Sequence, residues 1–146
     1  MRIVKSNLRG ELTAPPSKSY THRAIVLGVL TGEKFEILRP LFSEDTEATL
    51  SAVSMMGARI GRAVNSIRIH CPIITSPRDE IDAKNSGTTL RLISGIAALL
   101  DGKTQITGDE SLRKRPMRPL LNALRELGAK CAGEGEDEHP PVKIQG

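Results

Sequence analysis

The apolar positions of the chain fall into helical runs separated by short alternating segments. Residues 24–30 are apolar on nearly every side, a pattern that predicts a buried helix. Pro15 and Pro16 lack amide hydrogens and force an extended approach, so the helix begins after them. Gly32 predicts its end. The two candidate N-terminal caps are Ser17 and Ser19.

A strand, a second helix and another strand are predicted to follow. Lys34–Leu38 alternates polar and apolar residues, which indicates a strand. Ser43, followed by two acidic residues, predicts the start of the second helix, and Gly57 predicts its end. Residues 66–70 alternate again, so one βαβαββ unit is complete by Cys71. Opening strand segments are predicted at residues 2–4 and 11–14.

The same order of signals then returns. Residues 80–83 resemble residues 11–14, and Asp101–Gly102, after the next apolar helix, matches Thr31–Gly32. Because the matched positions lie about 70 residues apart, we predict an internal repeat. The apolar positions assigned to this helix are Leu90, Leu92, Ile93, Ile96, Leu99 and Leu100.

The second copy is predicted to close like the first. A strand at residues 105–107 precedes a helix that has Pro116 in its first turn and ends at Gly128. The acidic residues 134–138 are interpreted as a solvated hairpin loop. The apolar face of the helix is assigned to Leu120, Leu121, Leu124 and Leu127. The closing strands are predicted at Cys131 and at residues 142–144.

Together these elements predict an α/β (α+β) fold made of two βαβαββ units. We expect a strand segment at residues 1–14, a first unit at residues 15–78 and a second unit at residues 79–146. A chain of 146 residues is long enough for two small units to share one core.

Charge and composition favour small anionic partners. The formal net charge is +4, which favours phosphorylated molecules or nucleic acid. Tyr20, Phe35 and Phe42 are the only aromatic residues, so there is little to stack exposed bases. We therefore expect small-molecule anions and no nucleic acid as partners.

Other classes of protein lack their usual signals. Cys71 and Cys131 lie far apart without a C-x-x-C pattern, and the three histidines show no ligand spacing, so we expect neither a disulfide framework nor a metal. No apolar run reaches membrane-spanning length, and the N-terminus has no signal-peptide core. A cytoplasmic protein without membrane contact is expected.

The candidate chemistry gathers at helix N-termini. The first turn of a helix offers unpaired N–H groups and a partial positive charge, which suit an anion. Lys18, Ser19 and Arg23 add two cations and a hydroxyl at the first apolar helix. At the equivalent helix of the second unit, Gly87 allows close approach to the backbone and Thr88 adds a hydroxyl. Two anion sites are therefore predicted.

Three further features complete the set of charged candidates. Arg91 lies about one turn into the second of these helices, as Arg23 does in the first. The loop Arg113–Pro116 places cations at the predicted start of the last helix. Asp45 and Glu47 form a possible carboxylate pair, but their place at a helix start favours electrostatic capping.

Taken in order, Pro16–Ser19 with Arg23, Asn85–Thr88 with Arg91, and Arg113–Pro116 resemble the N-terminal part of the 5-enolpyruvylshikimate-3-phosphate (EPSP) synthase family. The resemblance covers essentially the whole chain. It implies the inside-out α/β barrel of the enolpyruvyl transferases, in which two halves each contain three βαβαββ units. Two of the six units would be present, and the opening strand segment would join the other half.

The resemblance also implies a reaction and a set of site residues. The reaction is transfer of the enolpyruvyl group from phosphoenolpyruvate to the 5-hydroxyl of shikimate 3-phosphate, with release of phosphate and without a cofactor. Lys18 would be catalytic and contact both substrates. The remaining assignments are Ser19 and Arg23 to shikimate 3-phosphate, Gly87 and Arg115 to phosphoenolpyruvate, and Thr88 and Arg91 to supportive roles.

Two departures from the family pattern bear on these assignments. Family members often carry glycine at the position of Pro16, and proline at the position of Leu92. The second position lies behind the predicted phosphoenolpyruvate site, so it bears on affinity for that substrate and for the inhibitor glyphosate. The remaining units are absent from the sequence, so we expect a substrate-binding fragment that self-associates, in a family that is usually monomeric.

Two alternative functions remain open from the sequence. The sister enolpyruvyl transferase that acts on UDP-N-acetylglucosamine has Lys-Asn in the first loop and usually a cysteine before the last helix. This chain has Lys18–Ser19 and no cysteine between Gly108 and Pro119, which favours the EPSP synthase family. The other alternative is a non-catalytic module that binds anions or nucleic acid through a basic surface.

Overall fold

The first helix follows the proline pair as predicted. The structure, a computed structural model, describes residues 7 and 9–146. Helix α1 spans Lys18–Thr31, and the Ser17 hydroxyl caps it by accepting a hydrogen bond from the Tyr20 amide at 3.3 Å. The helix ends at Gly32, whose φ of 73° lies in the left-handed region that glycine adopts without strain. Local sequence therefore sets both ends of α1.

The first unit combines α1 with a second helix and a three-stranded antiparallel sheet. Helix α2 spans Glu44–Met55, and a capping box between Ser43 and Thr46 fixes its start. The sheet has the order β1-β3-β2, with Ile37 opposite Ile67 and Phe35 opposite Ile69. Its strands are β1 (Lys34–Leu38), β2 (Arg59–Ala63) and β3 (Ser66–His70).

The second unit repeats this arrangement with one strand more. Its sheet has the order β4-β5-β7-β6, and β4 runs parallel to β5 while the other pairs are antiparallel. The strands are β4 (Ile81–Asp82), β5 (Thr104–Thr107), β6 (Lys130–Glu134) and β7 (His139–Gln145). The helical segments are α3 (Gly87–Ala97), a 3₁₀ turn η1 (Leu112–Lys114) and α4 (Arg118–Glu126).

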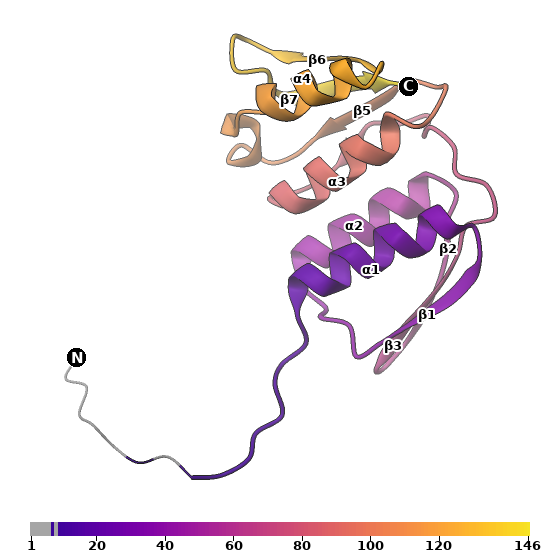
Figure 1. The fold of residues 1–146 in the computed structure, drawn as a ribbon, viewed down its shortest axis with the longest axis vertical. Helices are drawn as coiled ribbons and strands as arrows, with labels where there is room; N and C mark the ends of the chain where they lie inside the picture. Colours follow the sequence, from indigo (N-terminus) through magenta and orange to yellow (C-terminus); the bar gives the residue numbers. More distant parts are fainter. Residues whose placement is uncertain (1–6, 8) are drawn as a thin grey trace.

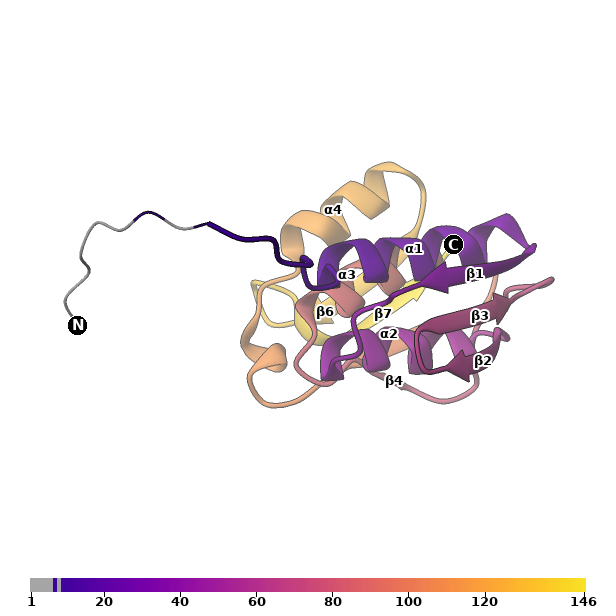
Figure 2. The ribbon, with the colours of Figure 1, turned by 90° about the horizontal axis from the view of Figure 1, so that it is seen from below.

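Helices α1, α2 and α3 lie between the two sheets, as Figure 1 shows, and Figure 2 shows the same stack from below. One continuous core joins the units, because α3 of the second unit packs against both helices of the first. Its largest fully buried side chains include Ile25, Leu50, Leu90, Ile93 and Ile106. The α/β fold with repeated units is thus confirmed. No helix of the described residues has the length and apolar character needed to cross a bilayer.

The opening segment differs from the prediction. Residues 9–14 form no strand, and Leu12 is 88% exposed, because nothing in the described chain pairs with them. The strand predicted at residues 2–4 lies outside the described residues. In the second unit, by contrast, the equivalent residues form β4 on the edge of its sheet.

The last two helices also correct the prediction. Helix α4 begins at Arg118, so Pro116 precedes it and Pro119 occupies its first turn. Leu127 follows the helix and is 84% exposed rather than part of its apolar face. The buried face of the helix is therefore narrower than the set of four leucines assigned to it. Likewise α3 ends at Ala97, which leaves Leu99 outside the helix and exposed.

Candidate anion-binding site

The N-termini of three helices from both units line one cavity of about 740 Å³. The first turn of α1 contributes Lys18 and Ser19, that of α2 contributes Asp45, and that of α3 contributes Gly87 and Thr88. Because the positive ends of three helix dipoles meet there, the cavity favours negative charge before any side chain is considered. The residues of the two predicted anion sites therefore line one cavity.

Side-chain charges add to the helix dipoles. The cavity is lined by four cations, Lys18, Arg23, Arg91 and Arg115, and by two carboxylates, Glu44 and Asp45, so its formal charge is 4 − 2 = +2. All seven site residues that the resemblance implied line it, the five assigned to substrates and the two assigned supportive roles. Asn85 and Leu92 complete the lining.

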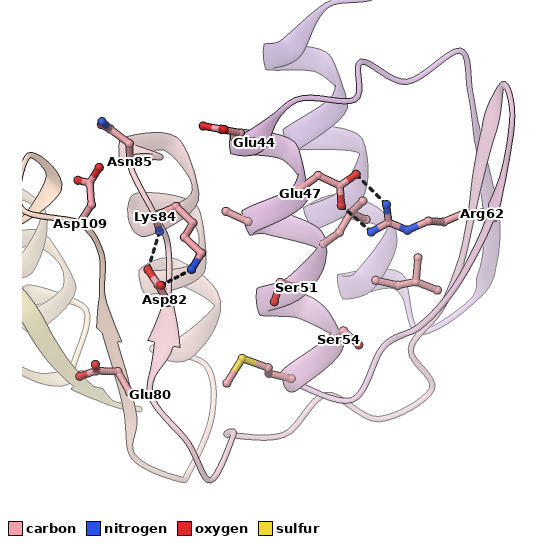
Figure 3. Close-up of a pocket in the computed structure, with 14 residues that line it drawn as sticks. Glu44, Glu47, Ser51, Ser54, Arg62, Glu80, Asp82, Lys84, Asn85 and Asp109 are labelled. Atoms are coloured by element: carbon pink, nitrogen blue, oxygen red, sulfur yellow. Dashed lines mark hydrogen bonds and ion pairs between the residues drawn. The ribbon is translucent and has the colours of Figure 1, made fainter.

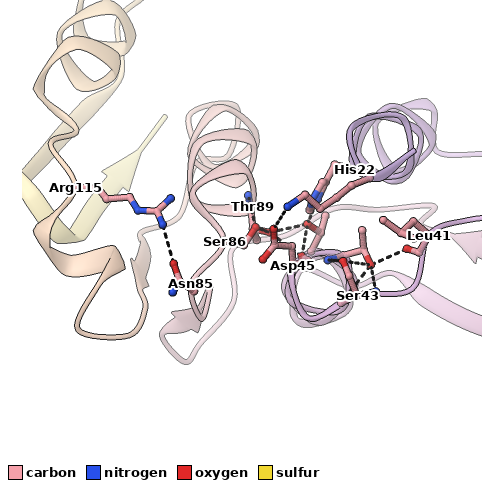
Figure 4. Close-up of polar contacts among 11 residues, drawn as sticks. His22, Leu41, Ser43, Asp45, Asn85, Ser86, Thr89 and Arg115 are labelled. Carbon is pink, nitrogen blue, oxygen red and sulfur yellow. Dashed lines mark hydrogen bonds and ion pairs between the residues drawn. The ribbon is translucent and has the colours of Figure 1, made fainter. Parts of the chain in front are cut away.

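Gly87 is the point where two guanidinium groups meet the start of α3. A Cβ atom built at this position would lie 2.6 Å from Nη1 of Arg115 and 2.9 Å from Nη1 of Arg91, so any side chain there would have to displace the ends of both arginines. Arg91 Nη1 donates a hydrogen bond to the Gly87 carbonyl at 3.1 Å. Figure 4 shows the second contact, in which Arg115 Nη2 donates to Asn85 Oδ1 at 2.7 Å. The sequence indicated close approach by a ligand, whereas the structure shows close approach by the arginines.

Asp45 has a role that the sequence did not reveal. Its carboxylate accepts a hydrogen bond from Lys18 Nζ at 2.6 Å, in an ion pair between two residues that line the cavity. The sequence favoured electrostatic capping, and Asp45 does lie in the first turn of α2. Lys18 precedes Asp45 by 27 residues in the sequence, so no local sequence pattern predicts this pair. Glu47, the other member of the supposed pair, instead binds Arg62.

A buried chain of hydrogen bonds lies directly behind the cavity (Figure 4). Thr49 Oγ1 lies 2.7 Å from both His22 Nδ1 and Thr89 Oγ1, and Thr89 Oγ1 lies 2.7 Å from Ser86 Oγ. All four residues are at most 1% exposed. Burial lowers the pKa of His22 and outweighs the opposing effect of Asp45, so the imidazole is held in its neutral form.

Two cations of the basic loop lie away from the cavity, which corrects their predicted place at the start of the last helix. Arg113 and Lys114 belong to the η1 turn. Arg113 Nε donates to Thr107 Oγ1 at 3.1 Å, and Lys114 Nζ pairs with Glu110 at 2.6 Å. Only Arg115 of this loop reaches the site, because the backbone becomes extended there and aims its side chain at Asn85.

A second and larger cavity, of about 990 Å³, lies between α2 and β4 (Figure 3). Its two cations are already paired, Arg62 with Glu47 and Lys84 with Asp82, and the remaining carboxylates leave it with an excess of negative charge. An anion would be repelled there. Charge therefore selects the smaller cavity as the candidate site. Across residues 7 and 9–146 no cluster of His, Cys, Asp and Glu side chains could hold a metal ion.

Two units that share an α–β–α–β–β order of elements, with helices α1, α2 and α3 between the two sheets, and a cationic cavity at the helix N-termini define an enolpyruvyl transferase architecture. The particular family follows from sequence. The family model described as EPSP synthase (3-phosphoshikimate 1-carboxyvinyltransferase) matches residues 4–146, and the chain belongs to this family.

Curated relatives and solved structures agree with this assignment. The 3-phosphoshikimate 1-carboxyvinyltransferases of Methanocella arvoryzae and Methanosarcina mazei are 51% and 50% identical to this chain and match 99% of it. The match covers 35% and 34% of those relatives, so the chain spans about a third of their length. The EPSP synthase of Acinetobacter baumannii superimposes with a TM-score of 0.87 at 36% identity, covering 94% of this chain and 32% of that one.

A more distant structure shows only the shared fold. The enolpyruvyl transferase NikO from Streptomyces tendae has a TM-score of 0.55 at 15% identity, over 86% of this chain and 30% of that one.

Proposed function

We propose that this chain supplies one wall of the active site of an enzyme that transfers the enolpyruvyl group from phosphoenolpyruvate to shikimate 3-phosphate and releases phosphate. The observation that carries the proposal is the single cavity in which four cations and three helix N-termini converge. Both substrates carry phosphate and carboxylate groups, and such groups bind guanidinium, ammonium and free backbone N–H groups. Membership of the EPSP synthase family supports the reaction.

The positions of the side chains support a division of roles within the cavity. Ser19 and Arg23 on α1 hold shikimate 3-phosphate, and Gly87 with Arg115 holds phosphoenolpyruvate. Lys18, at the start of α1 and paired with Asp45 of α2, serves as the catalytic residue that contacts both substrates. Thr88 and Arg91 on α3 are supportive, since Arg91 is itself bonded to the Gly87 carbonyl.

Bringing two anions together is the main task that these residues perform. Two substrates with several negative charges repel each other in water, and a cavity with a formal charge of +2 and three helix N-termini offsets that repulsion. Holding both reactants in one orientation makes an encounter between two molecules resemble a reaction within one. The Lys18 ammonium uses one of its three N–H donors for Asp45, and the other two remain for an incoming phosphate.

An amide NMR titration of the 146-residue chain with shikimate 3-phosphate tests the proposal, with shikimate and inorganic phosphate as comparison ligands. We expect saturable shifts at Lys18, Ser19 and Arg23 that are larger than with either comparison ligand. Arg23→Gln is expected to weaken binding about tenfold, because it removes a charge-assisted contact. Lys114→Gln, in which the lost cation lies outside the cavity, is the matched control and should bind as the unaltered chain does.

The opposite result would be equally clear. Equal affinity for inorganic phosphate and shikimate 3-phosphate, or equal losses in Arg23→Gln and Lys114→Gln, would contradict the substrate assignment. A steep salt dependence without ligand selectivity would instead indicate a nonspecific polyanion-binding module.

We also infer a cytoplasmic location and small-molecule rather than nucleic-acid partners. The scarcity of aromatic residues supports the second inference, and so does the gathering of cations in one cavity. Gel-shift measurement with single-stranded RNA tests it, and saturable binding at physiological salt would count against it.

A further inference from the structure

The buried polar chain behind the anion cavity joins one side chain from each of the three helices that form the cavity. His22 comes from α1, Thr49 from α2 and Thr89 from α3, and Ser86 caps the N-terminus of α3. Hydrophobic packing alone would hold these helices together without fixing how far one slides along another. Directional hydrogen bonds of 2.7 Å do fix such positions.

Each member of this chain lies within one helical turn of a residue that lines the cavity. His22 precedes Arg23 and lies one turn after Lys18, and Thr89 follows Thr88. The link to α2 is still more direct, because the Asp45 carbonyl oxygen accepts a hydrogen bond from Thr89 Oγ1 at 3.1 Å. The residue whose carboxylate holds Lys18 is thus bonded through its backbone to α3.

We propose that the hydrogen-bonded chain from His22 through Thr49 and Thr89 to Ser86 positions the two halves of the anion site, with His22 donating from Nδ1 as its neutral terminus. The α1 half carries Lys18 and Arg23, and the α3 half carries Gly87. These four are positioning residues, since they act through the helices and do not line the cavity. The inference rests on the proposed function for its ligand, but its structural part stands without it.

The direction of the chain follows from counting protons. Each hydroxyl donates one hydrogen, so Thr89 gives its hydrogen either to Ser86 Oγ or to the Asp45 carbonyl. The Thr49 hydroxyl has acceptors within reach at Thr89 Oγ1 and at the Asp45 carbonyl. When His22 Nδ1 carries the proton it donates to Thr49 Oγ1, and His22 Nε2, which is buried without a partner, holds only a lone pair. The other tautomer would bury an N–H group without an acceptor, which is the costlier arrangement.

Removing one hydroxyl in the middle of the chain separates the positioning role from simple filling of space. Thr49→Val keeps the shape of the side chain but leaves the His22 Nδ1–H group buried without an acceptor. Thr49→Ser restores the hydroxyl. Thr104→Val is the matched control, because Thr104 is also buried, at 1% exposure, and its hydroxyl has no partner to lose.

Three measurements on the 146-residue chain decide the proposal. The ¹⁵N shifts of the His22 ring report its tautomer, residual dipolar couplings report the orientation of α1 relative to α3, and titration with shikimate 3-phosphate reports affinity at Ser19 and Gly87. For the unaltered chain we expect the Nδ1–H tautomer. For Thr49→Val we expect a changed α1–α3 orientation and about tenfold weaker binding, corresponding to one lost network bond. Thr49→Ser should stay within about threefold of the unaltered chain, and Thr104→Val should match it.

The outcomes separate this proposal from the proposed function. If folded Thr49→Val keeps the unaltered orientation and affinity, or if the His22 ring is protonated at Nε2 alone, the positioning role is wrong. If the unaltered chain binds shikimate 3-phosphate no better than inorganic phosphate, the substrate assignment fails, while the dipolar couplings and ring shifts still decide the role of the chain.

Discussion

The two units share one order of elements, but their sheets differ at one edge. In the second unit β4 pairs in parallel with β5 and covers the outer edge of that sheet. In the first unit the strand equivalent to β5 is β1, which lies at the edge of its sheet, and the described part of the opening segment, the counterpart of β4, extends away from it (Figures 1 and 2). The same repeat therefore yields four paired strands in one copy and three in the other.

The first helices of the two units also differ, and again the first unit is the more exposed. Helix α1 of the first unit leaves Tyr20, Leu27 and Leu30 exposed, whereas α3 of the second unit is buried against both α1 and α2. An exposed strand edge and exposed apolar side chains are surfaces that proteins usually cover. The difference teaches that the repeat determines the order of the elements, while the neighbours of each copy determine which of its surfaces are covered.

The largest effects are expected from core substitutions that test whether the two units unfold together or independently. Leu50→Ala in the first unit and Ile106→Ala in the second remove side chains that are at most 1% exposed, and each should lower the free energy of unfolding by about 2–5 kcal/mol. Because one core joins the units, urea denaturation should show one transition that both variants shift. Leu127→Ala, at an exposed position, should change stability by less than about 0.5 kcal/mol. Two transitions, each shifted by one variant, would mean that the units fold independently.

A matched pair of glycines tests how tightly the equivalent helices of the two units are packed. In α1, a Cβ atom at Gly28 would overlap the ring of Phe35, so Gly28→Ala should destabilise the chain by about 1–3 kcal/mol. In α3, a Cβ atom at Gly95 would meet no neighbour within 4 Å, so Gly95→Ala should stabilise it by about 0.5–1 kcal/mol through helix propensity. Thermal unfolding monitored by circular dichroism measures both. Effects of the same sign would show that the packing contrast is wrong.

The dependence of stability on pH sharpens the comparison of the buried polar groups. Burial lowers the pKa of His22, with Asp45 raising it and Lys18 lowering it to smaller extents. Below the unfolded-state pKa of about 6.5, the unfolded chain binds a proton that the folded chain excludes. The contribution of His22 is therefore complete above that pH and is lost as pH falls from there toward the folded pKa, at no more than about 1.4 kcal/mol per pH unit.

Urea denaturation at pH values between about 5 and 7.5 measures this slope, above the range in which carboxylates titrate. His22→Asn, whose amide nitrogen can occupy the place of Nδ1 without a titrating ring, should flatten it. A slope that persists unchanged in His22→Asn would assign the effect to another group.

Local sequence predicted the parts of the fold that local chemistry controls. The proline pair and the cap at Ser17 set the start of α1, and Ser43 set the start of α2. The prediction failed where neighbours decide. The segment at residues 11–14 forms no strand without a partner, and the start of α4 depends on how the chain turns after η1.

The candidate site shows the same division. Each cation could be found from its place near a helix N-terminus, but the meeting of the two predicted sites in one cavity follows from the packing of α3 against α1 and α2. The Lys18–Asp45 ion pair joins residues 27 positions apart. The buried chain joins His22 to Thr49 across 27 positions and Thr49 to Thr89 across 40, which is 67 in all. No sequence periodicity connects positions this far apart.

The smallest expected effects concern two arginine–glutamate ion pairs, one in each unit, that occupy equivalent places. In the first, Arg62 of β2 donates to both carboxylate oxygens of Glu47 on α2, from Nη1 at 2.8 Å and from Nη2 at 2.5 Å. In the second, Arg125 of α4 donates to both carboxylate oxygens of Glu138, beside β7, and also to the Cys131 carbonyl. Each pair fastens the second helix of its unit to the closing hairpin.

The second pair should contribute more than the first, because the Glu138 side chain is 15% exposed and that of Glu47 is 38% exposed. Exposed pairs of this kind contribute about 0.2–1 kcal/mol, so we expect the loss of stability in Arg62→Gln to lie near the lower limit and that in Arg125→Gln near the upper.

The hydrogen bonds from Arg125 lower the pKa of Glu138, so the contribution of this pair should disappear as acid protonates the carboxylate. Urea denaturation at low salt and at about 1 M salt measures both variants, and screening should shrink the loss in Arg62→Gln more than in Arg125→Gln. If the two losses of stability were equal and equally sensitive to salt, the two ion pairs would contribute equally to holding helix and hairpin together. The contrast between the units would then be confined to the sheet edge and the first helices.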